Sequence, residues 1–119
     1  MISIIIPSYN NLPYLRKCIE SIGKNSFYNN EVLVHINEGK DGSIQYIKDN
    51  NIKFTHSNIN IGLCRACNKI GKKSKFNLIL YSHDDMYFLP EWDRFLIEEV
   101  QQLKTNKFYL SSIMINGDP

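Results

Sequence analysis

The regular alternation of apolar and amphipathic segments is the feature that most limits what this chain can fold into. Residues 2–6 contain four isoleucines and end at Pro7, which is typical of a strand covered on both faces of a sheet. Apolar residues then recur at helical spacing over residues 12–22. Asn11 is the expected N-cap of this helix, and Gly23 marks its expected end. We therefore predict a central strand followed by a helix that covers the sheet.

The same order of strand and helix continues along the chain. Further strands are expected at residues 31–37, 52–57, 76–82 and 108–115, and further helices at about 44–49, 63–70 and 90–104. Such alternation predicts parallel βαβ units with right-handed crossovers. The expected fold class is α/β, with an open, mostly parallel, Rossmann-like sheet and helices on both faces. A length of 119 residues suits one domain over residues 1–119.

Composition argues against several classes of protein. The 14 basic and 12 acidic residues are spread along the chain and give a net charge of +2, so a nucleic-acid partner is not expected. Three cysteines form an odd set and the N-terminus lacks a signal-peptide pattern, which favours the cytoplasm. No apolar stretch approaches the roughly 20 residues that cross a bilayer. Any membrane association would therefore be peripheral, at the inner face, or through a segment that is absent here.

Two groups of residues that suggest chemistry have simpler explanations. Cys64 and Cys67 form a C-x-x-C pair without a second pair, so core packing is favoured over a zinc or redox site. His35 and His56 lie within expected strands, where a packed imidazole is commoner than a ligand. The lysines at 69, 72, 73 and 75 form a basic cluster, for which a solvated face is favoured over a contact with anionic lipid.

The segments directly after the strands are the places to look for a ligand site. In open parallel sheets, ligands bind outside the carboxyl ends of the strands. Residues 7–10, 37–43, 58–62 and 83–86 occupy these positions. The chain contains neither G-x-G-x-x-G after the first strand nor G-x-x-x-x-G-K-[ST], so dinucleotide-binding and P-loop interpretations lose support.

Asp84 and Asp85 are adjacent acids at this edge of the expected sheet. Such a pair is costly unless a cation or solvent compensates the charge. Mg²⁺ and Mn²⁺ take oxygen ligands, and such an ion is often held by one or two carboxylates together with the oxygens of a bound diphosphate. The spacing alone leaves open a second interpretation, in which both acids only cap the following turn.

Taken together, these loops resemble the family 2 glycosyltransferases, which have the GT-A fold. The resemblance covers most of the chain and rests on four segments: S-I-I-I-P-S-Y-N at 3–10, the acidic loop at the end of 31–43, N-I-G and a helix of small residues at 60–68, and residues 83–85 in place of the D-x-D motif. Two departures stand out. Glu38 replaces a usual aspartate, and His83 replaces the first acid of D-x-D.

The resemblance implies a nucleotide-sugar site and a metal site. The nucleotide-sugar residues that it implies are Pro7, Ser8, Tyr9, Glu38, Arg65 and Asp84. The first three would line the uracil and ribose site, Glu38 would accept a hydrogen bond from a base N–H, and Arg65 would reach a phosphate or the base. Asp85 would be the acid that binds Mg²⁺ or Mn²⁺. Three outcomes of the change at His83 stay open: Asp84 takes over the vacant role, His83 itself contacts ribose or metal, or metal binding is weakened.

The implied reaction is transfer of a sugar, with inversion, from a UDP-sugar donor to a hydroxyl of an unidentified saccharide or lipid-linked acceptor. In the family, the catalytic base comes from the second half of the GT-A domain, so no catalytic residue is assigned. We expect the chain to be the N-terminal part of such a domain, able to bind nucleotide but inactive unless a partner chain supplies the rest. The oligomeric state is left open.

Two other classes remain as alternatives. A noncatalytic nucleotide-binding or assembly module would share all of the donor-side residues. A receiver-like signalling domain also places acids on a parallel sheet, but its acids cluster after the first strand. Residues 7–10 contain no acid, which counts against the receiver interpretation.

Overall fold

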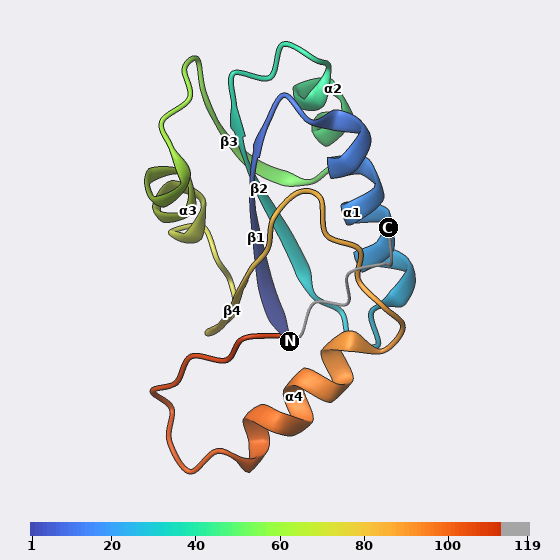
Figure 1. The fold of residues 1–119 in the computed structure, drawn as a ribbon, viewed down its shortest axis with the longest axis vertical. Helices are drawn as coiled ribbons and strands as arrows, with labels where there is room; N and C mark the ends of the chain where they lie inside the picture. Colours follow the sequence, from blue (N-terminus) through green and yellow to red (C-terminus); the bar gives the residue numbers. More distant parts are fainter. Residues whose placement is uncertain (113–119) are drawn as a thin grey trace, which may run out of the picture.

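A single parallel sheet organises the chain in the computed structural model, which describes residues 1–112 (Figure 1). Its strands are β1 (Ile2–Tyr9), β2 (Glu31–Asn37), β3 (Lys53–Ser57) and β4 (Leu78–Tyr81). They pair in the order β3-β2-β1-β4, and every pairing is parallel. The predicted fold class is therefore confirmed. The strand order reverses at β1, since β2 and β3 lie on one side of it and β4 on the other.

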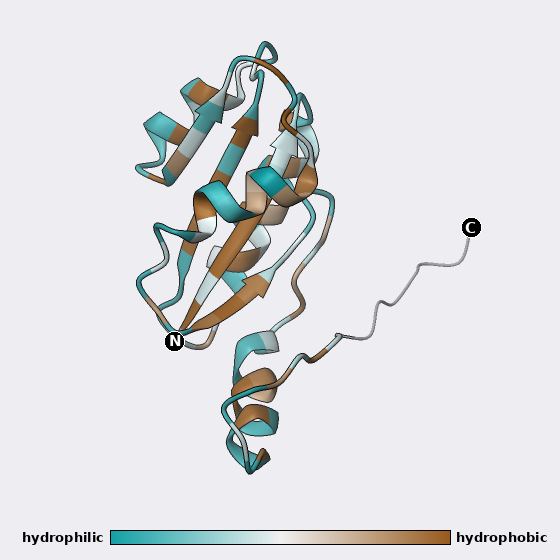
Figure 2. Ribbon diagram, turned by 90° about the vertical axis from the view of Figure 1, so that its left-hand side faces the viewer, coloured by the Kyte–Doolittle hydropathy of each residue, from teal (hydrophilic) through white to brown (hydrophobic). Residues whose placement is uncertain are grey.

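Helices cover both faces of this sheet. They are α1 (Leu12–Asn25), α2 (Ser43–Asp49), α3 (Leu63–Gly71) and α4 (Trp92–Gln102). Residues of α1 and α2 form the larger core cluster with β1 and β2, and side chains of α4 pack against it. On the other face, Ile70 and Cys67 of α3 pack with Ile5 and Leu33. In Figure 2 the hydrophobic colour runs along the strand that starts at the N-terminus, whereas the helices are banded with hydrophobic and hydrophilic residues.

The strand β1 continues past the predicted end at Pro7 and reaches Tyr9. Ile5 uses its carbonyl oxygen to accept a hydrogen bond of 3.0 Å from Ser82 N, on the β4 side. Alternate residues of a strand face the same neighbour, so Pro7 faces the β4 side as well. The pairing with β4 ends at Tyr81. Proline is tolerated here because no neighbouring strand requires its missing N–H.

The end and the cap of α1 also differ from prediction. The helix does not end at Gly23 but continues to Asn25, and Asn11 makes no side-chain capping hydrogen bond. Its burial pattern agrees with the predicted face, because Leu15, Cys18 and Ile22 are buried. Glycine lowers helix stability without forbidding a helix, so packing of this apolar face carries the helix through Gly23.

The predicted strand at residues 108–115 is not found where the structure describes it. Residues 108–112 form no strand, and residues 113–115 lie outside the described residues. An apolar run becomes a strand only where a neighbouring strand supplies hydrogen-bond partners, and none of the four strands pairs with residues 108–112. Among residues 1–112, no helix has the length and apolar character needed to cross a membrane.

Candidate functional site

An open pocket of about 280 Å³ lies at the carboxyl end of β1, where the strand order reverses. Its wall includes Pro7, Ser8 and Tyr9 from the end of β1, and His83 and Asp84 from the segment after β4. A second pocket of about 230 Å³ lies beside the last turns of α1, but no acid or base lines it. The first pocket is therefore the better candidate for a charged ligand, and it lies where open parallel sheets bind ligands.

The carboxylate of Asp84 joins the two sides of this pocket. Its Oδ2 accepts a hydrogen bond of 2.8 Å from Ser8 Oγ, and its Oδ1 accepts one of 3.1 Å from Asn11 Nδ2. Ser8 is buried, with 3% of its surface exposed. The segment after β4 and the loop after β1 are thus connected by charge-assisted hydrogen bonds, which are stronger than neutral ones.

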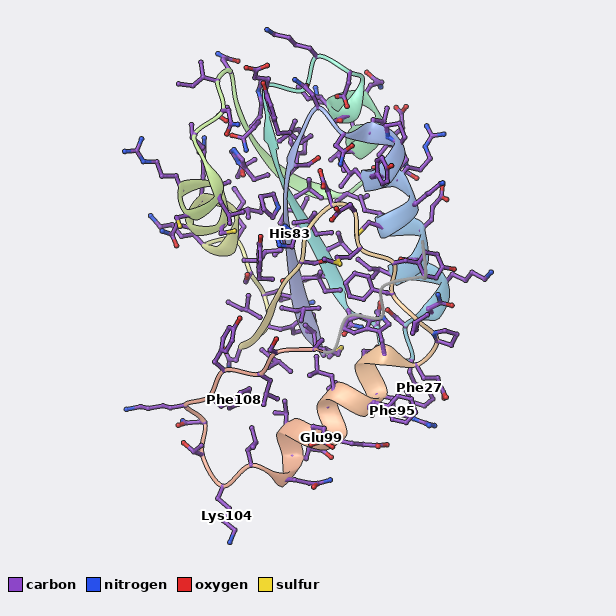
Figure 3. The ribbon with its side chains drawn as sticks, in the orientation of Figure 1. Phe27, His83, Phe95, Glu99, Lys104 and Phe108 are labelled. Atoms are coloured by element: carbon purple, nitrogen blue, oxygen red, sulfur yellow. The ribbon has the colours of Figure 1, made fainter. Side chains whose placement is uncertain are left out.

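His83 and Asp85 flank Asp84 but have different surroundings. Tyr81 Oη lies 3.2 Å from Nδ1 and 3.3 Å from Nε2 of the His83 ring, which is labelled in Figure 3. Asp85 is exposed and makes no hydrogen bond or ion pair with any residue of the described part of the chain. The acid that the resemblance assigns to a metal is therefore the one whose oxygens are free.

The residues after β4 fit a divalent cation only if a ligand shares it. Within residues 1–112, no group of three or more His, Cys, Asp or Glu side chains is placed to hold a metal ion. Mg²⁺ is commonly bound by one or two carboxylates together with substrate phosphate oxygens and water, without a cage made by the protein alone. The free oxygens of Asp85 suit that kind of site. Asp85 itself is not part of the pocket wall, but it follows Asp84, which is.

Glu38 and Arg65 are outside the pocket wall. Glu38 follows β2 with a φ of 60°, and its carboxylate accepts a hydrogen bond of 3.2 Å from Asn10 Nδ2 and pairs with Lys40 at 3.7 Å. The bond to Asn10 places this acid next to the loop after β1. Arg65 is exposed on α3, whose first residue, Leu63, does line the pocket. Neither residue forms part of the pocket wall.

Asp41 is a residue of this region that sequence analysis did not single out. Its Oδ2 accepts a hydrogen bond of 2.8 Å from Leu12 N at the start of α1, and its Oδ1 accepts one of 2.6 Å from Ser43 Oγ. Burial alone would raise the pKa of Asp41, but these hydrogen bonds outweigh burial and hold its pKa below the ordinary value. The loop after β2 is thereby attached to the first turn of α1. The Asp41-Gly42 pair is a common turn signal that could have identified it, and Asp41 Oδ1 also accepts a hydrogen bond of 3.1 Å from Ser43 N, two residues on.

The sequence analysis also did not predict that asparagines would line the pocket. Asn37, at the end of β2, is buried and its Oδ1 accepts hydrogen bonds from Ile61 N at 2.9 Å and from Ser57 Oγ at 3.1 Å. It shapes the wall by holding the loop that leads into α3. Asn11 and Asn60 also line the pocket. The available signal was position, since each lies at or just after the end of a strand.

A parallel α/β sheet with a polar pocket at the point where the strand order reverses defines the class of open, doubly wound α/β domains, which bind ligands at this edge. The chain belongs to glycosyl transferase family 2, whose family model matches residues 3–119. The resemblance found in the loops is thereby confirmed.

Comparison with solved structures supports the GT-A fold. The structure of S. aureus TarS residues 1–349 in complex with UDP has a TM-score of 0.75 and 21% identity, and the match covers 85% of this chain and 32% of that chain. The same S. aureus protein with UDP-GlcNAc has a TM-score of 0.69 and 20% identity, covering 83% and 30%. The mannosyltransferase PcManGT from Pyrobaculum calidifontis, in complex with GDP-Man and Mn²⁺, has a TM-score of 0.71 and 19% identity, covering 88% and 32%.

These similarities establish the fold and leave the ligand to be tested. The chain spans about a third of the length of those solved chains. Comparison with curated protein sequences gives no significant match.

Proposed function

We propose that this chain is the donor-binding part of a glycosyltransferase that uses a UDP-sugar and a divalent cation and inverts the anomeric carbon. The observation that carries the proposal is the hydrogen bond of 2.8 Å between Ser8 and Asp84. It joins the end of β1 to the acidic segment after β4, and residues of both line one pocket. A nucleoside and its diphosphate need such a combination, because the base requires a packing surface while the phosphates require positive charge from a cation.

The end of β1 supplies the surface for the base. Tyr9 lies in the pocket wall with 49% of its surface exposed, so its ring is accessible for stacking. Glu38, held beside the loop after β1 by Asn10, offers a carboxylate that accepts a hydrogen bond from a base N–H. Uracil has such an N–H at N3, whereas the corresponding nitrogen of cytosine is an acceptor. Guanine also has an N–H, at N1, so the choice of a UDP-sugar as the proposed donor rests on the UDP and UDP-GlcNAc found in the similar TarS structures.

The segment after β4 supplies the acid for the cation. Asp85 is exposed and would hold Mg²⁺ or Mn²⁺ together with the donor diphosphate. When bound, such an ion acts as a Lewis acid that stabilises the charge of the departing diphosphate. Arg65, exposed on α3, would add the planar donor fork that suits a phosphate. Mn²⁺ in the similar mannosyltransferase structure agrees with this arrangement.

The proposed function of this chain does not include binding or deprotonation of the acceptor. Transfer requires a general base that takes the proton of the acceptor hydroxyl, and we assign that role to no residue of this chain. The proposed acceptor is a saccharide or a lipid-linked saccharide. The proposed location is the cytoplasm, with peripheral association at the inner face of the membrane as a further proposal.

Calorimetric titration with UDP, with and without Mn²⁺, tests the proposal directly. We expect Mn²⁺ to raise UDP affinity by at least about tenfold, since a cation shared by protein and diphosphate adds a charge interaction at the pocket rim. Asp85→Ala should abolish this gain and keep the metal-free affinity. Asp49→Ala removes an exposed acid on α2 and should keep the gain. Equal UDP affinity under all of these conditions would contradict the metal site.

Two further measurements refine the assignment. A comparison of UDP with CDP should show a preference for UDP that Glu38→Gln reduces, because the amide replaces half of the acceptor capacity with a donor. Hydrolysis of a UDP-sugar, measured with and without acceptor saccharides, separates a transferase from a noncatalytic nucleotide-binding module. Turnover would exclude the module, whereas binding without turnover is expected both of the module and of a donor-binding part that lacks the acceptor half.

A further inference from the structure

Asn11 occupies the N-cap position of α1 but does not cap the helix. Asp41 takes over part of that role, since its carboxylate accepts the hydrogen bond of 2.8 Å from Leu12 N. The side-chain amide of Asn11 is therefore not needed for capping. Its Nδ2 donates a hydrogen bond of 3.1 Å to Oδ1 of Asp84, which lies 73 residues later in the sequence. Asn11 thus bonds a distant carboxylate and not the helix that it precedes. We conclude that the main structural role of its side chain is the contact with Asp84.

The segment that carries the acidic pair is attached to α1 on both sides of Asp85. Before the pair, Cys18 Sγ donates to the carbonyl oxygen of His83 at 3.6 Å. Burial raises the pKa of Cys18 to about 12, so this thiol keeps the proton that it donates. After the pair, Phe88 N donates to Ser21 Oγ at 3.0 Å, and Asn25 Nδ2 donates to Phe88 O at 2.6 Å. The helix α1 thus supports the acidic segment along its length.

Asp84 and Asp85 have opposite environments within this supported segment. Each oxygen of Asp84 accepts one hydrogen bond, from Ser8 Oγ at the end of β1 and from Asn11 Nδ2 in the loop after it. Asp85 is exposed and makes no polar contact with residues 1–112. Two hydrogen-bond donors fix the orientation of the Asp84 carboxylate. Turning its oxygens toward a cation would break these charge-assisted hydrogen bonds, so Asp84 would gain less free energy from binding the cation. The acid beside it has no such restraint.

We propose that Asn11 is a positioning residue that, with Ser8, holds Asp84 as a brace, so that the acidic segment presents Asp85 alone to the cation. This inference rests on the proposed function and names the roles within its metal site. Asp84 therefore does not take over the position that His83 has vacated. It acts through the segment that it fixes, in the way that outer-shell partners orient the ligands of a metal.

Substitution of Asp84 by asparagine and by alanine separates a brace from a ligand. Asparagine keeps the shape and can exchange hydrogen bonds with Ser8 Oγ and with a reoriented Asn11 amide, but it lacks the charge that a cation ligand supplies. We expect Asp84→Ala and Asn11→Ala each to reduce the Mn²⁺-dependent gain in UDP affinity by about tenfold, as for outer-shell partners of metal ligands. Asp84→Asn should recover most of what Asp84→Ala loses. A gain in Asp84→Asn as small as that of Asp85→Ala would overturn the proposal.

A metal-free measurement tests the brace independently of the cation. In a double-mutant cycle, Asn11→Ala and Asp84→Ala should lower the midpoint of thermal unfolding by less together than the sum of the single effects, because both remove one contact. Asn10→Ala is the matched control, since Asn10 contacts Glu38 and its effect should add to that of Asp84→Ala. Additive effects of Asn11→Ala and Asp84→Ala would overturn the proposal. Absence of any Mn²⁺ gain in the unaltered protein would instead count against the proposed function, and this cycle would still decide whether Asn11 braces Asp84.

Discussion

The backbone N–H of Tyr28 donates a hydrogen bond of 2.8 Å to Oδ2 of Asp93, 65 residues later in the chain. The N–H of Phe27 donates to Oδ1 at 2.8 Å, and Asn30 Nδ2 donates to Oδ2 at 2.7 Å. Asp93 is fully buried near the start of α4. Phe27, labelled in Figure 3, lies beside this helix. One carboxylate therefore attaches α4 to the loop between α1 and β2.

Replacing Asp93 by asparagine should destabilise the protein in a pH-dependent way. Burial alone would raise the pKa of Asp93, but the hydrogen bonds from Phe27, Tyr28 and Asn30 outweigh burial and hold its pKa below 3.8. A carboxylate with a lowered pKa stabilises the fold above its unfolded pKa, and this stabilisation is lost as pH falls through the folded pKa. We expect Asp93→Asn to lower the free energy of unfolding by about 1–3 kcal/mol at pH 7. Urea unfolding should show that the difference from the unaltered protein shrinks below about pH 4.

The matched control for that substitution is Asp49→Asn. Asp49 is exposed at the end of α2, and exposed substitutions usually change stability by less than about 0.5 kcal/mol. An equal effect of both substitutions, or a difference at Asp93 that is constant from pH 7 to pH 3, would contradict the structural role of its charge.

His35 should make stability depend on pH in the range where histidine titrates. It is fully buried on β2, with Nδ1 2.7 Å from Thr55 Oγ1 and Nε2 3.1 Å from Ser57 Oγ. Burial, followed by the charge of Lys69, lowers the pKa of His35 below 6.5. The unfolded state therefore binds the proton more readily, so stability is full above pH 6.5 and falls as pH drops toward the folded pKa.

Replacing His35 by glutamine should flatten this pH dependence. Denaturant unfolding between pH 7.5 and pH 5 should show a smaller slope for His35→Gln than for the unaltered protein. Thr55→Val is the control, because it removes one hydrogen-bond partner but retains the titrating imidazole, so it should lower stability and keep the slope. Identical slopes in the unaltered protein and His35→Gln would show that another group is responsible.

Two glycine substitutions should have opposite effects on stability. Gly39 has a φ of +79°, and an added Cβ would lie 2.8 Å from Ile36 Cγ2 and 2.8 Å from Ile44 Cγ1. Gly39→Ala should lower the free energy of unfolding by about 1–3 kcal/mol through strain and overpacking. Gly23 lies within α1, and an added Cβ meets nothing within 4 Å. Gly23→Ala should raise the free energy of unfolding by about 0.5–1 kcal/mol. Thermal unfolding of both variants checks the prediction, and an equal effect at both sites would contradict it.

Removing the ring of Tyr9 should weaken nucleotide binding without affecting the metal dependence. Stacking of a base on an aromatic ring contributes about 1–3 kcal/mol, so Tyr9→Ala should lower UDP affinity about tenfold with and without Mn²⁺. The control is Tyr14→Ala, because Tyr14 is similarly exposed, at 57%, but is not in the pocket wall. Calorimetry that finds equal UDP affinity for the two variants would exclude Tyr9 from the base site.

Sequence alone was sufficient for the architecture and for the position of the pocket. The isoleucines of β1 and the periodic apolar positions of α1 are local patterns, and each element can be recognised from residues close to one another. Parallel strands bring their carboxyl ends to one edge, so the placement of Tyr9 and Asp84 at a common pocket followed from the order of elements.

Only the tertiary structure determined which distant polar residues form hydrogen bonds with one another. Asn11 is a residue type preferred at a helix cap, yet its amide contacts Asp84. The donors to Asp93 come from a loop that precedes it by more than sixty residues. The predicted strand at 108–115 was wrong over residues 108–112 for the same reason, since no neighbouring strand pairs with it. Burial of an apolar face is specified by spacing along the chain. A hydrogen bond requires a particular partner within about 3 Å, and only the packed fold determines which distant residue that is.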